Sequence, residues 1–108
     1  MKILKFLLIV TFLFISNNII TFADEAKMKK GLEIFNETAA CAACHILKAA
    51  GSQGNIGPNL DTVSMTIESV IDMVTNGLGV MPAFGEGDML TKEEIETVSY
   101  FVVNSVKG

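Results

Sequence analysis

The sequence predicts a small all-α domain, residues 24–108, that follows an export signal. Three observations support this prediction. After residue 23, apolar residues recur at helical spacing in three segments; no segment alternates apolar and polar residues as a half-buried strand would; and glycine, proline and asparagine are frequent in the stretches between. A chain of 108 residues has room for one domain.

Residues 1–23 have the three parts of a secretory signal peptide. Lys2 and Lys5 give a positive start, residues 6–15 form an unbroken apolar run, and Ala23 is a small residue before a polar sequence. We therefore expect cleavage after Ala23 and export across the cytoplasmic membrane into the periplasm, with no stable membrane insertion afterwards.

The alternative for this segment is an uncleaved N-terminal membrane anchor. A helix that spans a bilayer needs about 20 predominantly apolar residues. The run here is shorter, and Asn17 and Asn18 interrupt its extension. The pattern favours a cleaved signal and leaves the anchor open.

The expected mature chain is acidic. All twelve Asp and Glu residues lie in residues 24–108, against six lysines, which gives a net charge near −6. Nucleic acid is excluded as a partner because its phosphates would repel this surface. A protein partner with a basic docking face fits the charge.

The first predicted helix of the domain covers residues 24–38. Met28, Leu32 and Phe35 recur at i, i+4 and i+7, with Gly31 on the same face. Glycine costs about 1 kcal/mol relative to alanine inside a helix. Its place on the apolar face therefore indicates that a later helix crosses there at close range.

A cluster of rare residues follows this helix. Cys41, Cys44 and His45 are the only cysteines and the only histidine of the chain. The C-x-x-C-H pattern is the attachment signature of a c-type haem, because two thiols about one turn apart can form thioethers with the two vinyl groups of the porphyrin. The adjacent His45 would then bind the iron as a neutral imidazole.

Three other interpretations of this motif stay open at this point. A thioredoxin-like dithiol would need a βαβ context, and no strand pattern precedes the cysteines. A zinc site would need four ligands, and the chain has no second Cys/His pair. A plain disulfide would leave His45 unexplained. Haem attachment uses all three residues, and it agrees with export because bacteria attach haem outside the cytoplasmic membrane.

The segment after the motif has the composition of irregular chain. Residues 46–56 are rich in Gly, Ser and Asn, which predicts a loop. It leads into a stiff tetrapeptide, Gly57–Leu60, in which Pro58 restricts its own backbone and that of Gly57. A haem-binding histidine needs an acceptor for its other ring N–H. The carbonyl of Pro58 is our candidate, and an ordinary turn is the alternative.

The second predicted helix covers residues 66–76, with Thr66 or Ser64 as its N-cap and Gly77 at its end. Its apolar stripe consists of Ile67, Val70, Ile71 and Val74. Met73 falls off this stripe and is expected to be a partly exposed packing residue.

Met81 is the candidate for a second iron ligand. It lies in the loop 77–84 between flexible glycines and a stiff proline, and a thioether sulfur is a soft ligand that raises the reduction potential of haem iron. Most methionines are packing residues, so this assignment depends on the haem motif upstream. Met65 and Met89, which lie in connections, are weaker competitors.

The last predicted helix begins at a capping box, residues 91–94, and runs to about Val106. Its apolar stripe consists of Ile95, Val98, Phe101, Val102 and Val106. We expect the ring of Phe101 to fit against Gly31, and Tyr100 to point away from the middle of the stripe.

In order and spacing, these elements resemble the class I cytochromes c, above all the small monohaem bacterial and photosynthetic members. The resemblance covers nearly all of the chain after the signal. It implies the small cytochrome c fold, with three to four helices around one covalently bound haem and the first and last helices crossing. It makes Cys41 and Cys44 the thioether anchors, His45 and Met81 the axial ligands, and Pro58 the carbonyl that orients the histidine.

The resemblance also implies an electron carrier that cycles between Fe(II) and Fe(III), not an enzyme, because two protein ligands on the iron leave no site for a substrate. Its partners would be redox proteins, such as a dehydrogenase, a cytochrome complex or a terminal oxidase, met at the haem edge near Ala42, Ala43 and Pro82. A monomer is expected. The alternative function is a cytochrome c subunit bound tightly to a periplasmic dehydrogenase. A peroxidase or gas sensor would need an iron that Met81 does not bind.

Overall fold

The computed structural model describes residues 2–106, apart from the side chains of residue 6 and residues 8–21. It is mostly helical, as predicted. The α-helices are α1 (Lys2–Glu33), α2 (Ile67–Asn76) and α3 (Lys92–Ser105). Single turns of other kinds are the π-turn η1 (Ile34–Thr38) and the 3₁₀ turns η2 (Cys41–Ala43), η3 (Lys48–Ala50) and η4 (Leu60–Thr62). Two short strands, β1 (Ile46–Leu47) and β2 (Ser52–Gln53), form an antiparallel hairpin.

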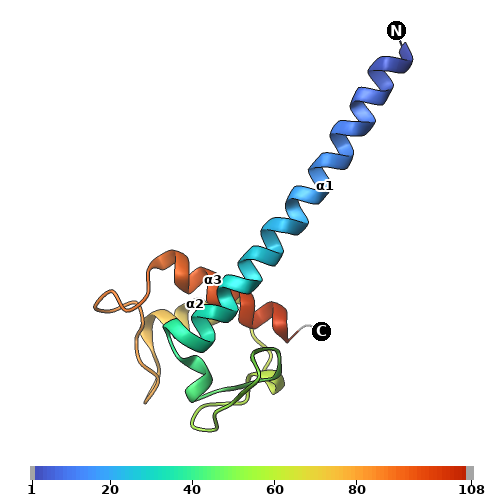
Figure 1. The fold of residues 1–108 in the computed structure, drawn as a ribbon. Coiled ribbons are helices and arrows are strands. Elements are labelled where there is room, and N and C mark those ends of the chain that lie inside the picture. The colour runs from blue at the N-terminus through green and yellow to red at the C-terminus, as the bar shows by residue number, and fades with distance from the viewer. Residues whose placement is uncertain (1, 107–108) are drawn as a thin grey trace.

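Helix α1 runs without a break from the expected signal peptide into the first predicted helix of the domain, as far as Glu33 (Figure 1). Its N-terminal half projects away from the other elements, so that the molecule is 67 Å long but only 29 and 22 Å across. No helix end marks the expected cleavage point after Ala23. Within the part of the chain whose side chains are described, no helix is both long and apolar enough to cross a membrane.

Helices α1 and α3 cross at Gly31, which confirms the predicted close contact (Figure 1). A Cβ placed on Gly31 would lie 2.3 Å from the Cβ of Phe101 and 2.9 Å from the carbonyl oxygen of Thr97. Four residues later, in η1, the ring of Phe35 meets the ring of Phe101 edge to face, with 6.0 Å between their centroids. Helix α3 is therefore contacted by α1 at a bare Cα and by η1 through an aromatic ring.

Tyr100 makes a different contact between the same two helices. Its hydroxyl donates to Oδ1 of Asp24 at 3.3 Å, and Nζ of Lys27 lies 4.7 Å from its ring centroid. Tyr100 thus ties the first residue of the expected mature chain to α3, and Phe101 is the aromatic residue that meets Gly31.

The end of the first predicted helix differs from expectation. The sequence predicts a regular helix to residue 38, but the chain after Glu33 forms η1, in which the N–H of Ala39 donates to the carbonyl oxygen of Ile34 at 2.9 Å. Ile34 and Phe35 are both buried, at 0% and 1% exposure. The predicted stripe leaves out Ile34, although Ile34 lies three residues after Gly31 and therefore on the same face of the helix.

The stretch predicted as a loop, residues 46–56, contains the β1–β2 hairpin. Leu47 lies opposite Ser52 in the pair, and its N–H donates to the Ser52 hydroxyl at 2.9 Å. The loop prediction is wrong at these positions because a strand of two residues is too short to show alternation.

Helix α2 matches its predicted bounds. Thr66, and not Ser64, is the N-cap: its hydroxyl accepts from the N–H of Ser69 at 3.2 Å, while the Ser69 hydroxyl accepts from the N–H of Thr66 at 3.1 Å. Gly77 ends the helix with a φ of 69°. The buried residues of this helix are Val70 and Val74.

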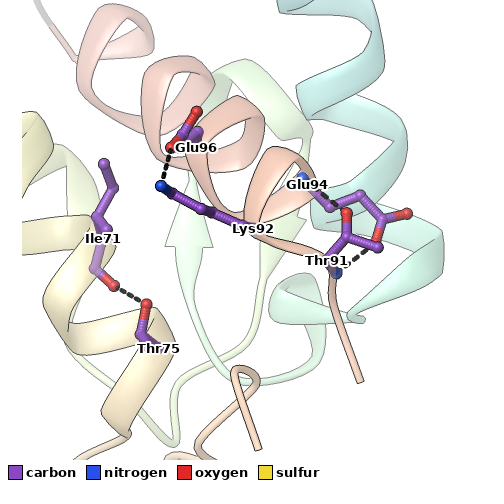
Figure 2. A network of polar contacts seen from close by, with 6 residues as sticks. All are labelled: Ile71, Thr75, Thr91, Lys92, Glu94 and Glu96. Carbon is purple, nitrogen blue, oxygen red and sulfur yellow. Dashed lines mark hydrogen bonds and ion pairs between the residues drawn. The ribbon is translucent and has the colours of Figure 1, made fainter. Parts of the chain in front are cut away.

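Helix α3 begins at the predicted capping box (Figure 2). The Thr91 hydroxyl accepts from the N–H of Glu94 at 3.2 Å, and the Glu94 carboxylate accepts from the N–H of Thr91 at 2.8 Å. Because α3 packs on both α1 and α2, its buried face is wider than the predicted stripe. The buried residues are Ile95, Thr97, Val98, Ser99, Phe101, Val102 and Val103.

Candidate haem-binding site

The C-x-x-C-H motif lies on the single turn η2. The N–H groups of Cys44 and His45 both donate to the carbonyl oxygen of Cys41, at 3.1 and 3.0 Å. The chain enters the turn through Ala40, whose φ of 52° is left-handed. Both thiols are free and partly buried. The two cysteines are therefore one turn apart, the spacing that two thioether bonds to one porphyrin require.

Cys41 packs against the hydrophobic core. Burial raises the pKa of its thiol to about 11, so the unmodified side chain is protonated at neutral pH. Gly54 approaches the backbone of this turn closely, because a Cβ on Gly54 would lie 2.6 Å from the carbonyl oxygen of Ala43. Sequence reasoning missed this role of Gly54, because no local pattern links it to a turn that ends eleven residues earlier.

His45 is held by the segment that contains Gly57 and Pro58. Its Nδ1 lies 2.8 Å from the carbonyl oxygen of Pro58, the acceptor that the sequence suggested. A carbonyl oxygen can only accept, so Nδ1 carries a proton, and in the neutral imidazole the lone pair is then on Nε2. The N–H of Gly57 donates to the carbonyl oxygen of Cys44 at 2.8 Å, and a Cβ on Gly57 would lie 2.5 Å from Cε1 of His45. The imidazole is thereby fixed in position and in tautomer.

Met81 lies in a tight hairpin turn after α2. Leu78 and Met81 exchange two backbone hydrogen bonds of 3.2 and 3.0 Å, and Gly79 between them has a φ of 59°. Farther along, the N–H of Phe84 donates to the carbonyl oxygen of Val74 at 2.9 Å, which returns the loop to α2. The Met81 side chain is partly buried against the core. Its backbone is therefore fixed to the end of α2.

Hydrogen bonds of the structure link four of the five predicted site residues, and the fifth lies on a different loop. Cys41, Cys44, His45 and Pro58 are joined through η2 and the hydrogen bond on Nδ1. Met81 lies on a separate loop that is hydrogen-bonded to α2.

The donor set fits haem c. Two thiols one turn apart, a histidine with its lone pair on Nε2, and a methionine thioether on a fixed loop are the groups that attach and ligate c-type haems. The bare Cα of Gly57 against the imidazole suits a ring that must keep one orientation. Among the described side chains, no three or more His, Cys, Asp or Glu residues come together as a site for a metal ion.

Comparison with known proteins agrees with this chemistry. Residues 26–102 match the family described as cytochrome c oxidase, cbb3-type, subunit III. Cytochrome c6 of Rippkaea orientalis is 32% identical over 111 residues, which cover 95% of this chain and 93% of that protein. Chloroplastic cytochrome c6 of Chlamydomonas reinhardtii is 34% identical over 90 residues, or 74% of this chain and 55% of that protein.

A solved structure shows the same fold. The c-type cytochrome SorU from Sinorhizobium meliloti superposes with a TM-score of 0.69 and is 44% identical, with 76% of this chain and 93% of that chain covered. The chain therefore belongs to the small class I c-type cytochromes. It carries covalently bound haem c, and it is a monohaem electron carrier that works with redox partners and not an enzyme.

Proposed function

We propose that the protein is exported to the periplasm and carries single electrons there, with His45 and Met81 as axial ligands of a haem attached through Cys41 and Cys44. The observation that supports this best is the 2.8 Å contact from Nδ1 of His45 to the Pro58 carbonyl. It leaves Nε2 to bind the iron and gives the ring the acceptor that an axial histidine needs. When bound, haem c supplies one-electron cycling between Fe(II) and Fe(III).

The backbone around Met81 supports its role as the second ligand. The paired hydrogen bonds to Leu78 restrict Met81 from one side, and Pro82 restricts the backbone from the other. A ligand on a rigid loop keeps a similar geometry in both oxidation states, which suits an electron carrier. Of the two competing methionines, Met89 is 53% exposed, and Met65 is partly buried against the core, as Met81 is.

Export rests on the sequence of residues 1–23, which we propose as the signal peptide, with residues 24–108 as the cytochrome domain. The family match begins at residue 26, just beyond the expected cleavage point. Among the described residues, those that pack on the hydrophobic core begin at Met28. Cleavage after Ala23 would therefore leave this core intact.

Met81→Ala is expected to abolish the weak far-red absorption band that reports a sulfur–Fe(III) bond. The protein would be produced with haem-attachment machinery, and its mass should equal that of residues 24–108 plus one haem. Met89→Ala, at an exposed methionine, removes the same atoms and should keep the band. Met81 is not the ligand if the band survives in Met81→Ala, or if the wild-type holoprotein has no such band. A measured mass that includes residues 1–23 would rule out cleavage.

The partner is proposed to be a redox protein with a basic docking face. Residues 86–96, which follow the Met81 loop, contain one lysine and five acidic residues, of which the exposed ones are Glu86, Asp88, Glu93 and Glu96. Opposite charges steer encounters between proteins, and salt screens them. The rate of electron transfer to such a partner should therefore fall as ionic strength rises.

The second candidate function is a cytochrome subunit held tightly in a larger redox complex, as in a periplasmic dehydrogenase. The matched family is described as an oxidase subunit, which favours keeping this candidate. A larger chain that remains bound through purification at high salt, together with electron transfer that does not depend on ionic strength, would support it against the diffusing carrier.

A further inference from the structure

Two segments at the site, residues 45–48 and residues 58–61, lie side by side and are joined by two hydrogen bonds. Nδ1–H of His45 donates to the carbonyl oxygen of Pro58 at 2.8 Å, and the N–H of Lys48 donates to Oδ2 of Asp61 at 2.9 Å. Each bond joins residues that are 13 apart in the sequence. Because the offset is the same, the two stretches run in the same direction with one bond at each end.

Asp61 is placed by the turn η4. Its N–H donates to Oδ1 of Asn59 at 3.0 Å, and the Thr62 hydroxyl donates to the carbonyl oxygen of Asn59, also at 3.0 Å. Asn59 directly follows Pro58. The carboxylate of Asp61 and the carbonyl of Pro58 therefore belong to one short, hydrogen-bonded unit.

The donor to Asp61 is also fixed in place. Lys48 follows β1, where Leu47 has 0% exposure and donates its N–H to the hydroxyl of Ser52. The bond from Lys48 to Asp61 lies at the surface and joins the η4 turn to a hairpin whose Leu47 and Ser52 are buried.

We propose that Asp61 is a positioning residue for His45, an inference that rests on His45 being the axial ligand as proposed above. Pro58 has no N–H with which to anchor its own segment. The N–H of Gly57 holds one end of that segment through Cys44, and the Asp61 carboxylate holds the other. A hydrogen bond to a carboxylate is about twice as strong as one between neutral groups. Asp61 therefore determines where the Pro58 carbonyl lies.

The effect would reach the iron through the imidazole. An acceptor on Nδ1–H makes the ring a more basic ligand and fixes its orientation, and a more basic ligand favours Fe(III). If the Pro58 carbonyl drifts away from Nδ1, this stabilisation of the oxidised state weakens. Loss of the Asp61 carboxylate should therefore raise the reduction potential.

The test compares Asp61→Ala with Asp61→Asn in the holoprotein. Both variants remove one negative charge, but only asparagine keeps an oxygen that can accept from the N–H of Lys48. In the reduced protein, NMR should show the Nδ1–H of His45 exchanging with solvent about tenfold faster in Asp61→Ala, the loss expected for one charge-assisted hydrogen bond. The increase should be clearly smaller in Asp61→Asn, whose neutral amide oxygen still accepts from the N–H of Lys48. The reduction potential should rise further in Asp61→Ala than in Asp61→Asn.

Equal exchange rates in Asp61→Ala and the wild type would overturn the positioning role, as would equal potentials in the two variants. Lys48→Pro gives the same test from the donor side, in case Asp61→Ala does not fold. It removes the N–H, and the extended backbone of Leu47, with φ −148° and ψ 112°, accepts a following proline. It should reproduce the faster exchange with Asp61 intact, and an unchanged rate would count against the proposal.

The proposed function is checked separately in the same samples. In the oxidised wild-type protein, a His45 bound to iron has ring protons shifted far outside the diamagnetic range. If that shift is absent, axial ligation by His45 is wrong. If the shift is present but exchange in the variants is unchanged, only the role of Asp61 is wrong.

Discussion

Replacing Gly31 with alanine is expected to destabilise the folded holoprotein by about 2 kcal/mol or more, even though alanine is the better helix former by about 1 kcal/mol. The new Cβ would lie 2.3 Å from the Cβ of Phe101 and 2.9 Å from the carbonyl oxygen of Thr97. Both neighbours belong to the rigid frame of α3 and cannot rotate away. The two helices must therefore separate, which also weakens the contact of Phe101 with Phe35.

Denaturant unfolding followed by circular dichroism measures this effect as a lower midpoint. Lys29→Ala is the matched control, because it puts alanine at an exposed position of the same helix, two residues earlier. It should shift the midpoint little. A midpoint for Gly31→Ala at or above that of the wild type would mean that the helices do not cross at this distance.

Replacing Gly57 with alanine is expected to disturb the histidine directly. Its Cβ would lie 2.5 Å from Cε1 of His45 and 2.8 Å from Nδ1, so the ring must turn away from the Pro58 carbonyl. The cost is about 1–3 kcal/mol for overpacking and about 1 kcal/mol for the lost hydrogen bond. We expect a lower unfolding midpoint together with an altered haem spectrum in the same variant.

Gly51→Ala separates crowding from backbone strain. Gly51 has a left-handed φ of 65° but no heavy atom within 4 Å of an added Cβ. This control should lose about 1 kcal/mol of stability through strain alone and keep the wild-type haem spectrum. If Gly57→Ala and Gly51→Ala give the same spectrum and midpoint, the close approach of Gly57 to the imidazole has no consequence.

The helices of the domain were predictable because their signals are local. The caps of α2 and α3 need only residues three apart, so Thr91 and Glu94 could be read directly from the sequence. The choice between Thr66 and Ser64 at the start of α2 was open until the structure showed which hydroxyl accepts from Ser69. The crossing at Gly31 was predictable because a glycine on the apolar face of a helix lowers its stability unless a neighbouring element needs the space.

The parts that the sequence did not reveal depend on contacts between distant residues. The bond from Lys48 to Asp61 joins positions 13 apart, and no periodicity connects them. Gly57 resembles any glycine before a proline until the imidazole is placed against it. At the site, the chemical requirement of an axial histidine was more informative than any sequence periodicity. Such a histidine needs an acceptor for its other ring N–H, and that requirement pointed to the carbonyl of Pro58. Ligation by Met81 stays a prediction.

The number of residues in the π-turn η1 affects the direction in which the chain leaves the first helix. It lies between Phe35 in the core and Cys41 in the motif, and its turn holds about one residue more than an α-turn. Each residue of an α-helix rotates the chain by about 100°. Because both kinds of turn make about one rotation, deleting one residue from Ile34–Thr38 would restore a regular helix and leave Cys41 in nearly the same direction relative to Phe35. Removing a second residue would swing Cys41 through about 100°, so this segment can lose one residue, but not two, without turning the motif away from the core.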